Sequence, residues 1–243
     1  FSSSLDAAIH HILAHSPTVN SGMIFKDLHT DRTIYAAKVD HLFTPASCTK
    51  LFTATAALLA FGPNYTFETK ILGPTIPQNG IIAGPIFIQF SNDPSLTAQD
   101  IDQLIKGLAI KKIKQIQGNI ILTVPTLNVA PYGLGGTFDS IPYCYSAPVA
   151  GLIINENCTH VTITTRGPAP GHSSLKLESG FSGKNHIQWI WNNHVPLTCV
   201  FQPHMNNQNE LDLKGCLNAK KQWSFNFAIQ NPSLYAARMI RHD

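Results

Sequence analysis

The sequence is poor in charge and has no long apolar run. Asp, Glu, Lys and Arg make up 13% of its 243 residues and the net charge is +3, whereas soluble proteins usually carry about 25% charged residues. Nucleic-acid binding needs a dense stripe of Lys and Arg, so this composition excludes a nucleic-acid partner. The longest apolar stretch, residues 51–61, is broken by threonines and is shorter than the roughly 20 residues that span a bilayer. With 44% hydrophobic residues, the chain is expected to fold around a large core without a membrane span.

Two further absences concern processing and cysteine chemistry. The chain has no initiator Met and no basic segment followed by an apolar one, so we expect Phe1 to begin a processed or trimmed chain whose targeting signal has gone. The five cysteines show no Cys-x-x-Cys spacing, which excludes a zinc ribbon or a thioredoxin-type dithiol. Because five is an odd number, at least one thiol must stay free.

The first part of the chain predicts an α-β-β-α order. Ser4 is a typical N-cap for a helix whose apolar residues recur at a spacing of three and four. Thr44 and Pro45 precede the most hydrophobic helix in the sequence, which we expect to lie at the centre of a domain. The predicted elements are a helix over 5–15, strands over 22–28 and 33–37, and a helix over 46–60.

From Tyr65 onward the sequence consists of short β-like runs separated by Gly and Pro. A helix is predicted over 98–108, with Thr97 as its cap and Asp100 in its first turn. Another helix is expected over 233–241. The predicted strands cover residues 66–72, 85–90, 119–124, 151–154, 160–165, 187–191, 197–202, 211–216 and 223–229.

The residues with the clearest chemical potential are Ser47 and Lys50, which form a Ser-x-x-Lys. Positions i and i+3 lie on one helix face, so both side chains would project from the first turns of the helix predicted over 46–60. The positive end of that helix favours an alkoxide on Ser47, and desolvation of Lys50 by apolar neighbours would let its amine act as a base. A second Ser-x-x-Lys, at Ser173 and Lys176, lies in an expected loop or edge strand. The spacing alone leaves a plain helix-start serine equally open.

Residues 43–54 around this pair resemble the active-site helix of the low-molecular-mass penicillin-binding proteins of class C, the serine D-alanyl-D-alanine carboxypeptidase family S13. The similarity is collinear over essentially the whole chain, so the family assignment is strong although each motif is modest. The other resembling segments are Asn-Asp-Pro-Ser-Leu-Thr at 92–97, Tyr-Ser-Ala-Pro at 145–148 with Leu152, Asn-Glu-Asn at 155–157, Gly-Cys-Leu at 215–217 and Asn-Pro-Ser-Leu-Tyr-Ala-Ala at 231–237.

The resemblance implies an α/β chain of the α+β kind, the N-terminal part of a β-lactamase/transpeptidase-like domain with a large β-rich inserted region. It assigns residues 1–66 to the catalytic domain, 67–230 to inserted accessory domains and 231–243 to a helix that returns to the catalytic domain. It also implies that Ser47 attacks the carbonyl of the penultimate D-Ala, with Lys50 as general base and the Ser47 amide as half of an oxyanion hole.

The resemblance further implies the partners and the compartment. Peptidoglycan stem peptides are the implied substrates, β-lactam antibiotics the implied inhibitors and the bacterial periplasm the implied location. No cofactor and no metal is expected. His11 and His15 have a metal-compatible spacing but no third ligand nearby, so a solvated helix face is expected instead.

Part of the family's machinery is missing from the sequence. The Ser-x-Asn and Lys-Thr-Gly elements should follow the helix over 233–241, and no Lys-Thr-Gly occurs anywhere. Ser224 and Asn226 have the Ser-x-Asn spelling but lie in an alternating strand ahead of that helix, so we expect no catalytic role for them. The chain is then either a fragment, with the missing motifs on a C-terminal fragment of the same protein, or a naturally shortened relative.

A second departure from the family concerns substrate specificity. The family often carries an Asp and, four residues on, an aromatic residue that receive the diaminopimelate side chain. This sequence has Thr123 and Leu127 at those places, so that recognition is not expected.

A disulfide is predicted between Cys199 and Cys216. The two strands expected on either side of the polar run 205–209 would form a hairpin centred between positions 207 and 208. Cys199 then faces Cys216, at a Cα separation of about 4.5 Å that a disulfide can span. Two unpaired, half-buried thiols are the alternative.

Two functions are therefore open. The first is a peptidoglycan D-Ala-D-Ala carboxypeptidase or endopeptidase that works through a serine acyl-enzyme, of which this chain alone is inactive. The second is a truncated, non-catalytic relative that binds the cell wall or has a structural role. A class A β-lactamase also uses Ser-x-x-Lys, but the long β-rich insertion after the helix disfavours it.

Overall fold

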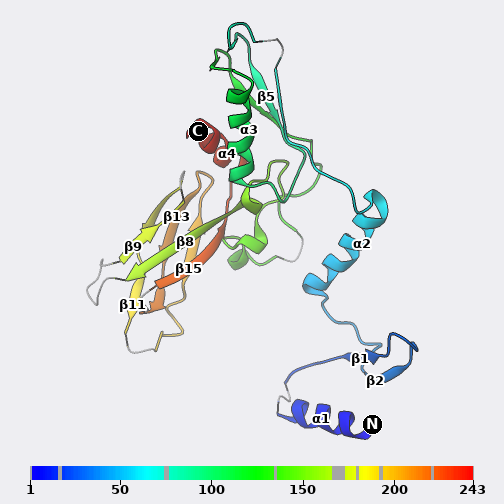
Figure 1. The fold of residues 1–243 in the computed structure, drawn as a ribbon. Coiled ribbons are helices and arrows are strands. Elements are labelled where there is room, and N and C mark those ends of the chain that lie inside the picture. Colours follow the sequence, from blue (N-terminus) through cyan, green and yellow to red (C-terminus); the bar gives the residue numbers. More distant parts are fainter. Residues whose placement is uncertain are drawn as a thin grey trace. The chain divides into compact units, whose positions relative to one another are not determined.

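The structure, a computed structural model, describes residues 2–15, 18–73, 77–133, 136–165, 173–178, 181–191, 194–219 and 222–242. The chain divides into two compact units, Phe1–Tyr65 (unit 1) and Thr66–Asp243 (unit 2), whose elements are labelled in Figure 1. Among the described residues, no helix has both the length and the apolar character that crossing a membrane would need.

Unit 1 has the predicted α-β-β-α order. β1 and β2 pair antiparallel around a turn that Asp27 closes by accepting the backbone N–H groups of Thr30 and His29. These two hydrogen bonds lower the pKa of the Asp27 carboxyl because they stabilise its charged form. Ser4 lies inside the first helix rather than at its cap. The elements are α1 (Ser2–Ala14), β1 (Met23–Lys26), β2 (Thr33–Ala37), the 3₁₀ turn η1 (Ala46–Cys48) and α2 (Thr49–Phe61).

α2 is well specified locally but does not lie in a core. It ends at Gly62, whose φ of 76° suits glycine and whose N–H bonds to the Leu58 carbonyl. None of its residues is buried, and Phe52 and Leu59 are 76% and 83% exposed. The expectation that this helix is central is therefore wrong for the described part of unit 1, because that part leaves the apolar side chains of α2 in solvent.

Unit 2 combines small sheets with two helices. β5 is the middle strand of the sheet β3-β5-β7, and β8 is the middle strand of the sheet β15-β8-β9. The remaining sheets of the described residues are β10-β13-β12, β4-β6 and β11-β14. The strands are β3 (Lys70–Leu72), β4 (Ile81–Ile82), β5 (Ile86–Gln89), β6 (Gln115–Ile116), β7 (Ile120–Thr123), β8 (Cys158–Thr165), β9 (Ser173–Lys176), β10 (Ser182–Asn185), β11 (Gln188–Ile190), β12 (Gln202–Met205), β13 (Glu210–Lys214), β14 (Cys216–Asn218) and β15 (Gln222–Ala228). The helical elements are α3 (Ala98–Ile110), η2 (Phe138–Ser140), η3 (Cys144–Ser146), η4 (Asn155–Asn157) and α4 (Pro232–His242).

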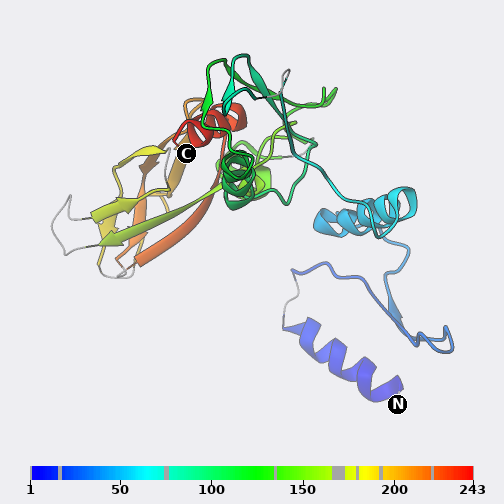
Figure 2. The same cartoon turned by 45° about the horizontal axis from the view of Figure 1, so that its top comes forward.

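The first core of unit 2 joins α3 and α4 to the sheet around β5. The two helices lie side by side in both ribbon views (Figures 1 and 2), and their residues Ile101, Tyr235 and Ala236 pack with Ile88 of β5. α3 begins with the predicted cap, because the Thr97 hydroxyl accepts the Asp100 N–H while the Asp100 carboxylate accepts the Thr97 N–H.

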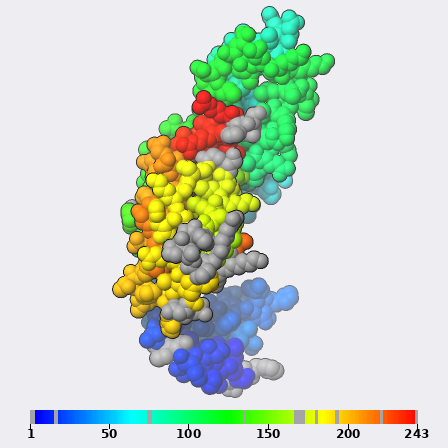
Figure 3. Space-filling model, turned by 90° about the vertical axis from the view of Figure 1, so that its left-hand side faces the viewer, coloured from blue at the N-terminus to red at the C-terminus, as the bar shows by residue number. Residues whose placement is uncertain are grey.

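The second core lies between the strands β8, β12, β13, β14 and β15. Alternate residues of β8 and β15, such as Val161, Ile163 and Phe227, are fully buried, as the two-residue period of a strand requires. The stacked rings of Trp223 and Phe225 continue the aromatic row along β15. In Figure 3 the strands of this part, drawn in yellow and orange, adjoin α4, drawn in red.

Two predicted strands are not formed. Residues 151–154 lead instead into η4, where three consecutive residues have a positive φ. Residues 197–201 are not extended either, because the chain turns there, with the Cys199 N–H bonded to the Pro196 carbonyl. Alternation over a few residues does not distinguish a strand from such irregular segments.

The predicted disulfide between Cys199 and Cys216 is confirmed, with a Cα separation of 5.4 Å. The register that led to it is wrong by one position. Gln202 faces Lys214, whereas the predicted hairpin pairs it with Leu213. Gly215 reconciles the two findings. Its φ of 85° redirects the chain between β13 and β14, and a Cβ atom there would lie 1.8 Å from the Val200 carbonyl oxygen.

A second disulfide, Cys144–Cys158, links η3 to the start of β8. The sequence did not predict it, because neither cysteine lies in a recognisable hairpin. Cys48 is the free cysteine, as the odd count requires, and it is exposed.

Candidate functional site

Ser47 lies in the 3₁₀ turn η1, directly before α2. The Cys48 N–H bonds to the Pro45 carbonyl at 2.9 Å, and the Thr49 N–H bonds to the carbonyls of Ala46 and Ser47. The turn therefore runs into the helix without a break, although the first turn is tighter than the predicted α-helix. Ala46 has a φ of 44°, a left-handed conformation that costs a non-glycine residue about 1–2 kcal/mol. The residue before the candidate nucleophile is thus strained, as is common at functional sites.

Lys50 lies on the same face as Ser47, one turn along. Its Nζ donates a hydrogen bond to the Ser47 Oγ over 3.4 Å, so the predicted contact is confirmed. Both side chains are exposed, and Leu51 beside them is 71% exposed. The expected desolvation of Lys50 is therefore not present among the described residues. A lysine can act as the base for a serine nucleophile when apolar surroundings exclude water from its amine, and the described residues do not provide such surroundings here.

The alternative pairs in the sequence lie on strands of unit 2. Ser173 and Lys176 occupy β9 at the edge of its sheet, as predicted. Asn226, the end of the Ser-x-Asn spelling, lies on β15, and its Oδ1 is 2.8 Å from His160 Nδ1 on the neighbouring strand. This contact gives Asn226 a structural partner.

Thr123 is the last residue of β7, and Leu127 follows that strand. The Thr123 hydroxyl donates to the Ile88 carbonyl over 3.4 Å, and Leu127 offers only an alkyl side chain. His15 lies over His11, with its Nδ1 2.8 Å from the His11 carbonyl oxygen. In the part of the chain that the structure describes, no group of three His, Cys, Asp or Glu side chains could hold a metal ion.

Two of the resembling segments in unit 2, 92–97 and 231–237, bond to Asn155, which lies in a third, 155–157. Its Oδ1 accepts the Ala98 N–H at the start of α3, and its Nδ2 donates to the Tyr235 hydroxyl on α4. Its own N–H bonds to the Leu96 carbonyl. These three segments therefore help to hold the first core of unit 2 together.

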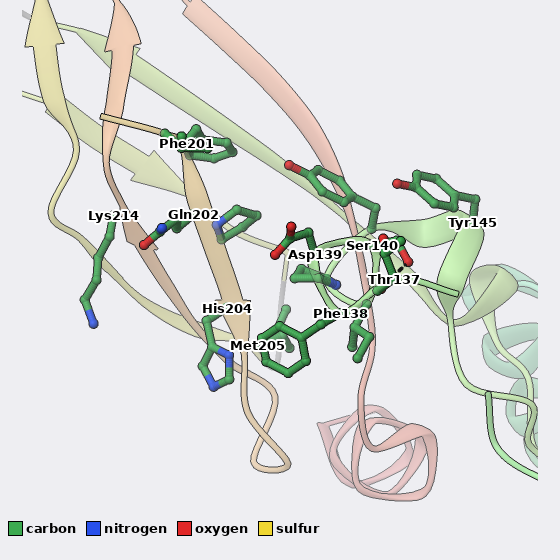
Figure 4. A pocket seen from close by; sticks show the side chains of 15 residues that line it. Thr137, Phe138, Asp139, Ser140, Tyr145, Phe201, Gln202, His204, Met205 and Lys214 are labelled. Carbon is green, nitrogen blue, oxygen red and sulfur yellow. Dashed lines mark hydrogen bonds between the residues drawn. The ribbon is translucent and has the colours of Figure 1, made fainter. Parts of the chain in front are cut away.

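A cavity in unit 2 was not found from the sequence. Its two walls are the segment 137–145 and the segment 200–205, which are far apart in the chain (Figure 4). In the sequence, this cavity is indicated only by the aromatic residues of its first wall, close to Cys144.

A serine and a lysine one turn apart at the start of a helix, followed by a long β-rich region, are the arrangement of the serine penicillin-binding proteins. The family of D-Ala-D-Ala carboxypeptidase 3 (S13) matches residues 5–243, and the chain belongs to this family.

Individual relatives agree with this assignment. D-alanyl-D-alanine carboxypeptidase DacB of Haemophilus influenzae is 28% identical over 92% of this chain and 47% of its own length. A D-alanyl-D-alanine carboxypeptidase of Actinomadura sp. is 25% identical over 67% of this chain and 31% of its own length. The chain thus spans half or less of the length of these relatives.

Solved structures show the same fold. Penicillin binding protein 4 (dacB) from Haemophilus influenzae superposes with a TM-score of 0.78 at 28% identity, covering 92% of this chain and 50% of the other. The same protein in complex with a novel β-lactam gives a TM-score of 0.70 over 92% and 48%. The expected α+β fold of this family is thereby confirmed.

Proposed function

We propose that this chain supplies the nucleophile and its lysine partner to a peptidoglycan D-Ala-D-Ala carboxypeptidase or endopeptidase. The observation that carries the proposal is the contact between Lys50 Nζ and Ser47 Oγ at the start of a helix. The names of the relatives and the β-lactam complex of one of them support it.

The proposed reaction has two steps. Ser47 Oγ attacks the carbonyl carbon of the penultimate D-Ala of a stem peptide, while neutral Lys50 takes the serine proton. The bond to the terminal D-Ala nitrogen then breaks, and this nitrogen leaves with the proton from Lys50. Water hydrolyses the resulting ester and restores Ser47. A β-lactam would acylate the same oxygen by opening its ring.

We further propose that residues 1–66 belong to the catalytic domain, 67–230 to inserted accessory domains and 231–243 to a returning helix. In this proposal the catalytic domain is completed by a C-terminal fragment that carries the Ser-x-Asn and Lys-Thr-Gly motifs. The exposed apolar side chains of α2 and the greater length of the relatives support it. Covering α2 would also exclude water from Lys50, and a lysine that acts as a general base needs such apolar surroundings.

The proposed location is the periplasm. Two disulfides, Cys144–Cys158 and Cys199–Cys216, support an oxidising compartment, since structural disulfides are rare in the cytosol.

The second candidate function is a non-catalytic relative that binds the cell wall. The exposure of Lys50 favours it for the chain on its own, because the described residues give its amine none of the apolar surroundings that a lysine base needs. The two candidates differ in one outcome, which is whether Ser47 can be acylated once the missing motifs are supplied.

A fluorescent penicillin tests the proposal. We expect little or no label on the chain alone, and label on Ser47 after addition of a polypeptide that carries the family's Ser-x-Asn and Lys-Thr-Gly motifs. In that complex Ser47→Ala should abolish the label and Lys50→Ala should slow it by about 10²-fold or more. Ser173→Ala, in the other Ser-x-x-Lys, is the matched control and should label normally. No label in the complex would favour the non-catalytic relative, and label on Ser47→Ala would refute the assignment of the nucleophile.

A further inference from the structure

The cavity in unit 2 has a volume of about 790 Å³, and its two walls come from distant segments of the chain (Figure 4). One wall, residues 137–145, presents aromatic rings. The other wall, residues 200–205, is joined by Lys214 of the neighbouring strand, and it places Gln202 and His204 among apolar side chains. Neither wall contains a residue that the proposed acylation uses.

Both walls are fixed before any ligand arrives. The aromatic wall is tied to β8 by Cys144–Cys158 and to the end of β15 by the Ala228 N–H, which bonds to the Pro142 carbonyl at 2.8 Å. The second wall is tied to β14 by Cys199–Cys216. Each disulfide thus holds one wall of the cavity, which lowers the entropy that binding would cost.

The aromatic wall leaves large rings in solvent. Phe138 is 82% exposed and Tyr145 is 78% exposed, and both line the cavity. The Tyr145 ring lies nearly parallel to that of Tyr143, at an angle of 4° and a centroid distance of 5.9 Å. Exposed aromatic faces beside a preformed hollow are typical of ligand sites, because they cost free energy in water unless a ligand covers them.

Polar groups surround these rings. Asp139 belongs to the aromatic wall, and Gln202 and His204 belong to the opposite wall, beside Lys214, whose Nζ forms an ion pair with Asp212 over 2.7 Å (Figure 4). Burial raises the pKa of the Tyr143 hydroxyl, and the neighbouring Tyr145 and Asp139 raise it further. The cavity therefore combines flat apolar faces with hydrogen-bonding groups of both kinds.

A pyranose ring matches this combination. Its C–H groups form an apolar face that packs on an aromatic ring, and its hydroxyl and acetamido groups lie at the edge, where they would reach donors and acceptors such as Gln202 and Asp139. A nucleic acid does not match, because Asp139 would oppose its phosphates.

We propose that this cavity binds the glycan strand of the cell-wall polymer. The proposal rests on the proposed function for the identity of the polymer, but it uses different residues and so can fail separately. The accessory region would then hold the sugar backbone while the stem peptide is processed elsewhere on the protein.

Binding of peptide-free glycan strands, measured by calorimetry on the full chain, tests the proposal. We expect binding by the wild type and about tenfold weaker binding by Tyr145→Ala and by Phe138→Ala, since each removes one stacking face. Both side chains are mostly exposed, so the variants should keep the wild-type melting temperature. Trp191→Ala, which removes a half-exposed ring outside the cavity, is the matched control and should bind normally.

Two further arms separate the possible outcomes. Ser47→Ala should bind the strands as tightly as the wild type, because glycan binding does not need the acylation site. Cellohexaose, a glucan without acetamido groups, should bind more weakly than the cell-wall strands. Absent binding, unchanged binding by both cavity variants, loss of binding in Ser47→Ala, or equal binding of cellohexaose would each overturn the proposal.

Discussion

Asn155 connects three segments of unit 2 that are distant in the sequence. Its side chain bonds the start of α3 and the Tyr235 hydroxyl, and its φ of 51° is left-handed. Asn155→Ala should lower the free energy of unfolding by about 2–4 kcal/mol, because two partners lose a hydrogen bond and alanine is strained at this φ. Urea denaturation of unit 2 measures the change.

Asn155→Gly separates the two causes. Glycine accepts the left-handed conformation, so this variant should lose the hydrogen bonds alone and be about 1 kcal/mol more stable than Asn155→Ala. Equal stability of the two variants would show that backbone strain contributes nothing at this position.

The cysteines give a prediction that needs no mutation. With two disulfides and a free, exposed Cys48, denatured protein should show one reactive thiol before reduction and all five after it. Thiol titration under non-reducing conditions measures this number, and peptide mapping then places the label on Cys48. Three reactive thiols would contradict the bond between Cys144 and Cys158 or the bond between Cys199 and Cys216.

At the scale of elements, α4 packs into the first core through the side chain of Tyr235. Burial raises the pKa of this phenol, although the hydrogen bond from Asn155 partly opposes the shift. In the unfolded chain the phenol ionises near pH 10, whereas the folded protein holds it neutral to a higher pH. Its contribution to stability is therefore complete below about pH 10 and is lost as the pH rises through the folded pKa.

Tyr235→Phe should remove this pH dependence. Near pH 7 the variant should be about 1 kcal/mol less stable than the wild type, because the hydrogen bond to Asn155 is gone. The difference should shrink as the pH rises above about 10. Thermal denaturation across this range checks it, with Tyr35→Phe in unit 1 as the control. A constant difference across the range would contradict a neutral, buried Tyr235.

Local signals in the sequence predicted many of these elements. The cap at Thr97, the hairpin of unit 1 and the contact between Ser47 and Lys50 depend on residues close in the chain, and the structure contains all three. The cavity and the bond between Cys144 and Cys158 depend on segments brought together only by folding. The burial of α2 was predicted wrongly because composition shows that a helix is apolar but does not show which part of the protein covers it.

At the scale of the whole molecule, unit 2 should fold without the help of unit 1. Both cores of unit 2 are built from residues after Tyr65, and both disulfides lie within this unit. We therefore expect residues 66–243 alone to unfold cooperatively with both disulfides formed. Near-ultraviolet circular dichroism during a thermal scan measures this. A broad transition without a fixed aromatic signal would show that unit 2 needs residues 1–65 to fold.

The pattern of the disulfides has a consequence for synthesis. Each bonded cysteine pairs with the next one along the chain, so no bond crosses another. In a chain that is made and folds from its N-terminus, the four bonded cysteines can therefore pair in order without an isomerase, provided that Cys48 stays reduced. Cys48 precedes these four cysteines in the sequence and is free. An oxidant that acts too early would join it to Cys144, which makes the timing of oxidation important for the yield of native protein.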